Sequence, residues 1–383
     1  MIAMAFNPRL ATARQRALAD RQHLVLAPPD GKVRLHRAAI GDPQAPLDTF
    51  LAVLEQHELL GDDGRLKGEV GLVSMGDHFD WGKVEQRAQA TVEGSAILAW
   101  LAAHPPDQVQ IIFGNHDLVR VGELAGFTDE EFTRARTEAD AAYRGGDVDL
   151  PRQAALLAKY PTLPKAEVVA RDFSCFEVAQ RVLVTRLLKE RRARLAVAAA
   201  ADLLLVHAGL TTADLQALEV PRADAFATAE ALNRFLDERV ERWSGEGPLD
   251  LAPLHEQGSA KDGEAKGILF HRGANPALKP ITRAERRYDP RTLPRWISQA
   301  IGHISDKKCR ELLGDWAEPG PPVFGRIRGL KLEGEQVRYR LGCEDGDALI
   351  YVDGGMSHVE PAQYELLDLR RRQPMSKRAI SGT

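Results

Sequence analysis

Residues 69–82 read EVGLVSMGDHFDWG and residues 109–117 read VQIIFGNHD, and these two stretches decide the fold class of the 383-residue chain. Each starts with apolar, largely β-branched residues and stops at a glycine that is followed by Asp or Asn. A short apolar run that ends in this way is typical of a buried strand feeding a loop. Loops at strand ends are where α/β proteins collect their catalytic groups.

Similar patterns occur on both sides of these stretches. The patterning predicts strands at 33–40 and 203–206, helices at 46–60 and 84–103, and short antiparallel strands at 324–332, 336–341 and 348–352. The first of these strands ends in GDPQ at 41–44, and the strand at 203–206 ends in HAG at 207–209. Strands that alternate with helices predict an α/β sandwich.

The region after GNHD turns to helical patterning. A capping box at Thr128 and Glu131 predicts a helix start, and residues 182–200 continue the helical pattern. We therefore predict a helical cap at 118–200, inserted into a main domain at 31–365. Residues 1–30 are expected to form an N-terminal helical segment, and 366–383 a disordered basic tail.

Composition excludes several classes of protein. Lys and Arg number 51 against 55 Asp and Glu, so there is no overall positive field to hold nucleic acid. The cysteines at 175, 309 and 343 form no CxxC pair, which argues against a disulfide framework and favours a reducing cytoplasm. No apolar stretch reaches the ~20 residues of a membrane span, so no membrane partner is expected.

Five candidate metal ligands adjoin these strand ends: Asp42, Asp77, Asn115, His207 and His303. Carboxylate, amide and imidazole groups suit divalent cations, and the neighbouring glycines allow tight turns of the backbone. Two such ions about 3.5–4 Å apart can bind a phosphate and activate a water molecule.

The order GD, GDxxD, GNHD, HAG and GH resembles the calcineurin-like metallophosphoesterases, and within them the phosphoprotein phosphatase (PPP) superfamily, over about residues 33–353. The resemblance implies a four-layer sandwich of two mixed β-sheets flanked by helices. The segment GILFHRG at 267–273 is similar to GxLWyRG of bacterial members. That segment and the long insertion after GNHD most resemble the bacterial Shewanella-like phosphatases.

The resemblance also implies a set of metal ligands and cofactors. The implied ligands are Asp42, Gln44, Asp77, Asn115, His207 and His303. Asp42 would bind one ion, Asp77 would bridge two, and Asn115 and the two histidines would bind the second. The expected cofactors are two divalent ions, with Mn²⁺ first and Fe, Zn, Ni or Mg as alternatives.

Catalytic roles follow from the same resemblance. His116 would protonate the leaving alkoxide, with Asp80 orienting its ring, while a metal-bridging hydroxide attacks phosphorus directly. Arg272 would bind the phosphate in bidentate fashion, and Asn115 would also contact the substrate.

Two positions depart from the family pattern. Gln44 stands where the family has a metal-binding histidine. It either completes an oxygen-rich site that favours Mn²⁺ or Mg²⁺, or leaves that site half-occupied and the enzyme slow or inactive. Trp81 stands where the family has a phosphate-binding arginine. It either stacks on a substrate ring or packs against the cap, and packing is the favoured interpretation.

Two further features have alternative interpretations. His78 either replaces the missing histidine ligand or lies at the surface or behind the ligands, and the second is favoured. Basic residues at 186–194 either meet a polyanionic substrate or form a solvated helix face, and the solvated face is favoured.

The sequence therefore predicts a cytoplasmic, dimetal-dependent phosphomonoesterase that acts on a phosphorylated protein or a small phosphate ester. The first alternative is a nucleotide hydrolase that cleaves a dinucleoside polyphosphate or a cyclic diester, which Trp81 motivates. The second is a catalytically degenerate phosphate-binding protein, which Gln44 motivates.

Overall fold

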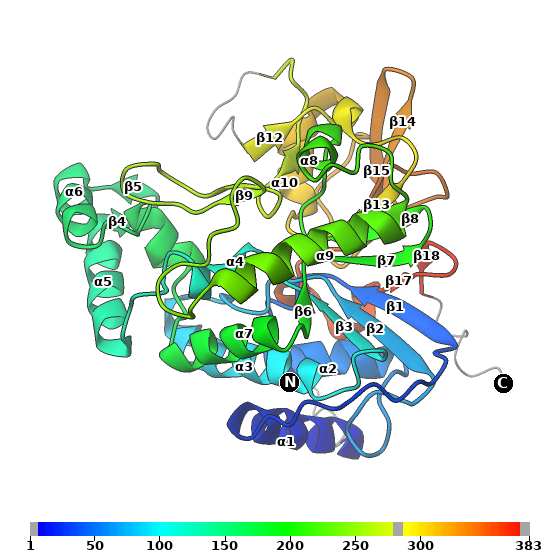
Figure 1. The fold of residues 1–383 in the computed structure, drawn as a ribbon, viewed down its shortest axis with the longest axis horizontal. Coiled ribbons are helices and arrows are strands. Elements are labelled where there is room, and N and C mark those ends of the chain that lie inside the picture. Colours follow the sequence, from blue (N-terminus) through cyan, green and yellow to red (C-terminus); the bar gives the residue numbers. More distant parts are fainter. Residues whose placement is uncertain (1–6, 279–285, 376–383) are drawn as a thin grey trace.

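The computed structural model describes residues 7–278 and 286–375. These form two six-stranded mixed β-sheets with helices on their outer faces (Figure 1). The predicted α/β class, with two mixed sheets flanked by helices, is confirmed.

The first sheet has the strand order β18-β17-β1-β2-β3-β6. Its strands are β1 (His36–Ile40), β2 (Val70–Ser74), β3 (Val109–Ile112), β6 (Ala193–Arg194), β17 (Leu367–Asp368) and β18 (Gln373–Pro374). The run from β1 to β6 is parallel, and β17 and β18 add antiparallel strands at one edge. All five residues of β2 are buried, as expected for a central parallel strand covered on both faces.

The second sheet has the order β15-β14-β16-β13-β8-β7. Its strands are β7 (Ala196–Ala200), β8 (Leu203–Val206), β13 (Ser298–Ile301), β14 (Arg328–Glu333), β15 (Gln336–Leu341) and β16 (Leu349–Tyr351). Strands β8, β13 and β16 are parallel, β7 and β14 pair antiparallel with β8 and β16, and β15 pairs antiparallel with β14. Val73 and Ile112 of the first sheet share a buried cluster with Leu205 and Ile350 of the second, so the two sheets pack face to face.

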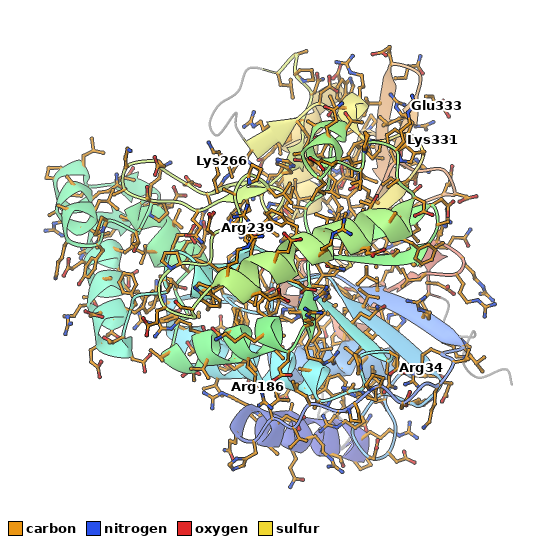
Figure 2. All side chains as sticks on the ribbon, viewed as in Figure 1. Arg34, Arg186, Arg239, Lys266, Lys331 and Glu333 are labelled. Atoms are coloured by element: carbon orange, nitrogen blue, oxygen red, sulfur yellow. The ribbon has the colours of Figure 1, made fainter. Side chains whose placement is uncertain are left out.

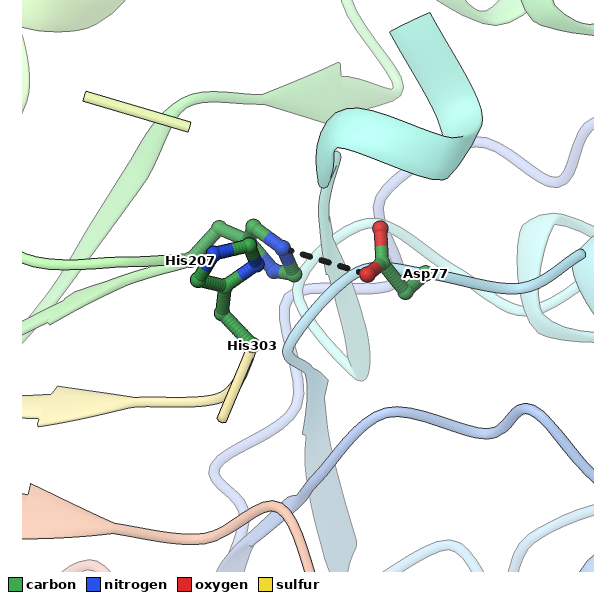
Figure 3. A group of neighbouring side chains, drawn as sticks. All are labelled: Asp77, His207 and His303. Atoms are coloured by element: carbon green, nitrogen blue, oxygen red, sulfur yellow. Dashed lines mark ion pairs between the residues drawn. The ribbon is translucent and has the colours of Figure 1, made fainter. Parts of the chain in front are cut away.

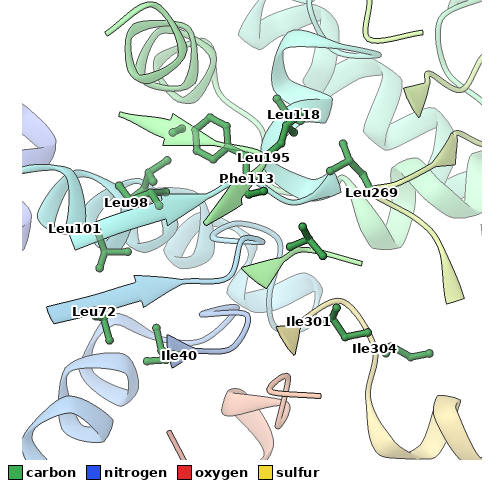
Figure 4. Close-up of a cluster of buried hydrophobic side chains, with 14 of the residues drawn as sticks. Ile40, Leu72, Leu98, Leu101, Phe113, Leu118, Leu195, Leu269, Ile301 and Ile304 are labelled. Carbon is green, nitrogen blue, oxygen red and sulfur yellow. The ribbon is translucent and has the colours of Figure 1, made fainter. Parts of the chain in front are cut away.

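Helices cover the outer faces of the sandwich. They are α1 (Pro8–Gln22), α2 (Leu47–Gln56), α3 (Arg87–Ala102), α7 (Val178–Lys189), α8 (Thr212–Ala217), α9 (Ala225–Arg242) and α10 (Asp306–Leu313). The main apolar core joins Ile40 and Leu72 of the first sheet to Leu98 and Leu101 of α3 (Figure 4). Trp100 is fully buried there, and its indole nitrogen donates to the Gly64 carbonyl oxygen at 3.0 Å.

The insertion contains α5 (Asp129–Ala142), α6 (Leu150–Lys159), the hairpin β4 (Tyr143–Arg144) to β5 (Asp147–Val148), and the π-helical turn η3 (Val168–Asp172). The predicted capping box is confirmed, because the Glu131 amide donates to Thr128 Oγ1 at 3.2 Å and Glu131 Oε2 accepts from the Thr128 amide at 3.0 Å. Phe132, Leu156 and Leu163 belong to an apolar cluster separate from the main core. The insertion therefore packs largely on itself.

The prediction of helix at 182–200 is wrong beyond Lys189. Residues Ala193–Arg194 and Ala196–Ala200 form β6 and β7, which are edge strands of the first and second sheets. Alanine favours helix, but pairing with β8 and packing against α9 override that preference here. Residues 193–200 thus belong to the sandwich and not to the insertion.

Both ends of the chain differ from the prediction. Of the expected helical segment 1–30, residues 8–22 form a helix, and the next regular element is β1. The predicted disorder from residue 366 is wrong for 366–375, where β17 pairs with β1 and where Leu366 and Leu367 are fully buried. Residues 376–383 lie outside the described residues. Within the described part of the chain, no helix is long and apolar enough to cross a bilayer.

Candidate active site

Parallel registers bring the motif loops to one edge of the sandwich. Ser74 of β2 pairs with Ile40 of β1 and with Ile111 of β3, so the loops after these strands leave side by side. In the second sheet, Val206 pairs with Ile301, which places His207 next to the turn that contains His303. The strand pairing therefore assembles the candidate ligands that the sequence scatters over 262 positions, from 42 to 303.

The backbone of these loops is unusual at the predicted site residues. Asp77, Asp80 and His303 have φ angles of 56°, 63° and 65°. Left-handed backbone is uncommon for residues other than glycine, costs of order 1–3 kcal/mol each, and clusters at functional sites. The three residues share this conformation at one edge of the molecule.

Asp117, the last residue of GNHD, joins the loops after β2 and β3. Its carboxylate is buried and accepts from the backbone amides of Asp77, His78 and Gly114 at 2.9, 3.1 and 2.8 Å. Asp117 was not among the predicted site residues, although it belongs to the most specific motif. Its three hydrogen bonds fix the backbone that presents Asp77.

Asp77, His207 and His303 form a cluster that could hold a metal ion, since one ligand atom from each lies within 4.8 Å of the others (Figure 3). His207 Nε2 lies 3.3 Å from Asp77 Oδ2 and 3.1 Å from Asn115 Oδ1. The other ring nitrogen of His207 lies 2.9 Å from the Met75 carbonyl oxygen, which orients the ring. Asn115 thus adjoins the same cluster.

Asp42 approaches this cluster from β1. Its Oδ2 accepts from the His303 amide at 2.8 Å. Asp42 Oδ1 and His303 Nε2 are buried, and neither has a hydrogen-bond partner within residues 7–278 and 286–375. Buried polar atoms without partners are rare, and a cation between carboxylate and imidazole donors would satisfy both. The donors that are present therefore fit divalent metal ions.

Burial and charge shift the acidity of these groups. Burial raises the pKa of Asp42 well above its ordinary value, with repulsion from Asp353 and Asp77 adding to the effect. Burial would also raise the pKa of Asp77, but attraction to His207, His116 and His303 lowers it instead. Burial and the charge of Arg272 lower the pKa of His303 well below its ordinary value. The ring of His303 is therefore neutral at pH 7, the form that binds metals.

Gln44 lies beside this cluster. Its amide nitrogen donates to the carbonyl oxygens of Phe79 and Asp80 at 2.8 and 3.3 Å. Only the amide oxygen of Gln44 is therefore a candidate ligand for a cation.

His116 and Asp80 form a hydrogen-bonded pair next to the candidate ligands. His116 Nδ1 lies 3.0 Å from Asp80 Oδ2, and the His116 amide donates to Asp77 Oδ1 at 2.9 Å. Burial alone would lower the pKa of the His116 ring, but the charges of Asp77 and Asp80 outweigh it and raise the pKa to about 9. The ring is therefore protonated at neutral pH, with Nε2 as the nitrogen that Asp80 does not engage.

A cavity of about 160 Å³ lies between two walls. We call the motif side the donor wall, which comprises Asp42, Gln44, Asp77, Asn115, His116, His303 and Asp353. The facing insertion wall comprises Val168, Arg171, Asp172 and Phe173. The loops around β10 (Lys266–Gly267), β11 (Arg272–Gly273) and β12 (Arg287–Tyr288) add Glu264, Phe270, Arg272 and Arg286.

The structure thus brings most of the predicted residues to one cavity. Asp80 and His207 lie directly behind residues that line it. Asp353 was missed, although it follows β16 in the same pattern of strand, Asp and glycine. The residues of the insertion wall carry no comparable motif.

The structure places Trp81 away from the cavity. Trp81 is 5% exposed and packs with Ala90 and Cys175. The packing interpretation therefore agrees with the structure, and the predicted contact between Trp81 and substrate is withdrawn.

His78 is neither at the surface nor a replacement ligand. It is fully buried, with one ring nitrogen 3.0 Å from Asp117 Oδ1 and the other 2.9 Å from Ser74 Oγ. Because both ring nitrogens are engaged, His78 supports the loop from behind the ligands.

The basic run at 186–194 is partly solvated and partly structural. Arg186 donates to the Leu24 carbonyl oxygen at 3.0 Å and lies near α1 in Figure 2. Arg192 is buried and donates to the His104 carbonyl oxygen at 2.9 Å, and Arg194 pairs with Asp237 at 2.7 Å. Arg186, Lys189 and Arg191 are exposed, as expected for a solvated face, whereas Arg192 and Arg194 are held by contacts with the rest of the protein.

Comparisons with known proteins add little at the level of sequence, since no family model and no curated protein matches the chain. Among solved structures, a cold-active protein tyrosine phosphatase is similar with a TM-score of 0.41 and 15% identity, over 91% of this chain and 78% of that one. A single-site mutant of a cold-active protein tyrosine phosphatase gives a TM-score of 0.36 and 14% identity, over 88% and 75%. Likenesses of this size support no argument about function.

Proposed function

We propose that this protein is a divalent-metal-dependent phosphomonoesterase whose substrate is a phosphorylated protein or a small phosphate ester. The observation that carries the proposal is the assembly around one cavity of three kinds of group. These are a cluster of metal donors, a hydrogen-bonded pair of His116 and Asp80, and the guanidinium of Arg272. Metal-assisted hydrolysis of a phosphate monoester can use all three functions, for activating water, for protonating the leaving group and for binding the phosphate.

The donor wall would hold two divalent ions. Asp42 and Gln44 would serve one ion, Asn115, His207 and His303 the other, and Asp77 both. The mixture of oxygen and imidazole donors suits Mn²⁺ first, with Fe, Zn, Ni and Mg as alternatives. Bound there, the ions would supply Lewis acidity that polarises the phosphoryl group and lowers the pKa of the attacking water.

The chain's own residues supply the remaining steps. Arg272 lines the cavity and would bind phosphoryl oxygens through its planar, permanently charged group. His116 would donate its Nε2 proton to the leaving-group oxygen, because Asp80 engages Nδ1. Its raised pKa, about 9, keeps that proton in place at neutral pH.

The nucleotide hydrolase and the degenerate phosphate-binding protein are the two alternative functions. The nucleotide hydrolase rests on stacking by Trp81 and on the absence of an arginine at that position, and burial of Trp81 removes the first of these two grounds. The degenerate binding protein was motivated by Gln44, whose amide nitrogen is held by the main chain of residues 79 and 80. A binding protein does not require His116 and Asp80 as an oriented pair, so catalysis is favoured.

The test is hydrolysis of p-nitrophenyl phosphate by metal-stripped protein to which Mn²⁺, Mg²⁺, Zn²⁺ or Ni²⁺ is restored. We expect metal-dependent turnover that falls about 10³-fold or more in Asp77→Asn, since loss of electrostatic stabilisation has effects of that order. Asp237→Asn is the control, because Asp237 pairs with Arg194 and does not line the cavity. Turnover that is unaffected by metal or by Asp77→Asn would contradict the proposal.

A further inference from the structure

We propose that Arg120 is a positioning residue for catalysis, which holds Asp80 in the orientation that presents the ring of His116 to the substrate. The kinetic part of this inference rests on the proposed phosphatase function, and its structural part does not. Arg120 lies outside the motifs and was not among the predicted site residues.

Arg120 lies in the turn η2 (Val119–Val121), directly after α4 (Asn115–Leu118), and is fully buried. One terminal nitrogen, Nη1, donates to Asp80 Oδ2 at 2.6 Å and also to the His116 carbonyl oxygen. Nε donates to Gln180 Oε1 at 3.1 Å, and Nη2 donates to the Cys175 carbonyl oxygen at 3.3 Å. The guanidinium thus uses each of its nitrogens and has one available orientation.

The ring of Phe79 and the hydrogen bonds of Gln180 fix the orientation of Arg120 further. The guanidinium carbon of Arg120 lies 4.5 Å from the centre of the Phe79 ring. Gln180 is fully buried, and its amide nitrogen donates to the carbonyl oxygens of Cys175 and Thr91 at 2.7 and 3.2 Å. Arg120, Gln180 and Cys175 therefore form a closed network that joins η2 to α3 and to the start of α7.

Asp80 depends on this network. Its Oδ2 accepts from His116 and from Arg120, and its Oδ1 accepts from the Cys175 amide at 3.0 Å. The carboxylate is fully buried, and Arg120 is the one Lys or Arg that pairs with it among the described residues. Without Arg120 this buried carboxylate keeps the ring of His116 as its remaining cationic partner among the described residues, so it takes up a proton more readily or turns toward water. Either change weakens its hold on the Nδ1–H of His116.

The network also connects the site to the insertion. Cys175 lies two residues after the insertion wall residue Phe173, and Gln180 lies in the first turn of α7. Phe173 itself packs edge-on against His116, with 6.1 Å between ring centres. Arg120 therefore ties the loop of Asp80 to the segment that leads out of the insertion.

A purely structural role for Arg120 makes a different prediction from a positioning role. An ester with a poor leaving group, such as phenyl phosphate, needs a proton from the acid, whereas 2,4-dinitrophenyl phosphate departs without one. Loss of the orientation of His116 lowers turnover of the first ester selectively. General loosening of the fold lowers turnover of both esters equally.

The kinetic experiment compares Arg120→Met with Arg87→Met. Arg87 is the matched control, because it is also buried and bonds Asp140 and the Ala170 carbonyl oxygen instead of Asp80. We expect kcat on phenyl phosphate to fall about 10- to 100-fold in Arg120→Met, part of the 10²–10⁴-fold range of acid–base catalysis. On 2,4-dinitrophenyl phosphate, kcat of Arg120→Met should fall less than about threefold. Arg120→Lys should recover part of the kcat that Arg120→Met loses on phenyl phosphate.

The structural experiment needs no turnover. In ¹⁵N-histidine NMR of the metal-free protein, the Nδ1–H proton of His116, assigned by its absence in His116→Asn, should appear downfield. It should move upfield or be lost to exchange in Arg120→Met and stay unchanged in Arg87→Met. If Arg120→Met does not fold, Gln180→Met keeps the arginine, removes its Nε contact, and should produce a smaller change in the same direction.

The outcomes are separable. Equal losses on both esters, or an unshifted His116 signal in Arg120→Met and Gln180→Met, would overturn the role of Arg120. Absence of any metal-dependent turnover in the unmodified protein, together with the expected NMR change, would overturn the proposed function and leave the positioning of His116 by Arg120 in place.

Discussion

The two walls of the cavity are built in different ways. The donor wall consists of loops at strand ends, and hydrogen bonds such as those that Asp117 accepts from three backbone amides fix these loops from behind. The insertion wall lies on the π-helical turn η3, at the end of a segment with its own apolar cluster. A wall held by the sandwich suits invariant chemistry, and a wall on a separately packed segment suits selection of the substrate.

The largest expected effect tests the donor wall. His116→Asn should lower kcat on phenyl phosphate about 10²- to 10⁴-fold, the range for loss of an acid–base group. Binding of Mn²⁺, measured by calorimetry, should change much less, because His116 is not among the proposed ligands. A variant with full activity would show that the proton comes from elsewhere.

A pH-dependent effect tests how the insertion docks. Burial raises the pKa of Glu123 to about 7, and its Oε1 accepts from the Gly258 amide at 2.8 Å. The carboxyl group of Glu123 binds its proton more tightly in the folded state than in the unfolded state. Its contribution to the free energy of unfolding is therefore full below the ordinary pKa of 4.5 and is lost as pH rises through 7. Between pH 4.5 and pH 8, ionisation of Glu123 should cost the unmodified protein up to about 3 kcal/mol of unfolding free energy. This loss should be absent in Glu123→Gln.

Urea unfolding of both proteins at pH 4.5 and pH 8 provides the measurement. The stability of Glu123→Gln should depend less on pH than that of the unmodified protein. Identical pH dependence would show that Glu123 is not buried in its uncharged form, and that the base of the insertion is looser than in the structure.

A smaller effect tests how closely the donor wall is packed. A Cβ at Gly302 would lie 2.0 Å from Asp42 Oδ1, so Gly302→Ala should displace Asp42. We expect affinity for Mn²⁺ to fall about 10- to 100-fold, as for loss of groups that orient ligands. Gly68→Ala is the control, since its Cβ would meet nothing within 4 Å. Unchanged affinity in Gly302→Ala would remove Asp42 from the proposed ligands.

The smallest expected effect tests the insertion wall. Arg171 lines the cavity and pairs with Glu167 and Asp172 at 3.2 and 2.9 Å. We compare kcat/KM for a phosphopeptide with kcat/KM for p-nitrophenyl phosphate. Arg171→Ala should change the ratio of these two values about tenfold, the scale of a charged hydrogen bond. Equal changes for both substrates would argue against selection by this wall.

Prediction from the sequence was strongest where a local pattern has a local cause. Apolar runs that stop at glycine and a polar residue located β2, β3 and β8, and the capping box located the start of α5. Prediction failed at 193–200 and 366–375, where alanine-rich or Arg-rich segments become strands only because other strands are present to pair with them.

The sequence by itself determined the α/β class, the order of the motif loops and the residues that could serve as ligands, because these depend on short-range patterning and on side-chain chemistry. The tertiary structure alone decided that Trp81 packs with Cys175, that Asp353 joins the cavity, and that Arg120 pairs with Asp80. The physical reason is that these contacts join residues 40 or more positions apart, which meet only after the two sheets and the insertion have packed together. No local pattern encodes that distance.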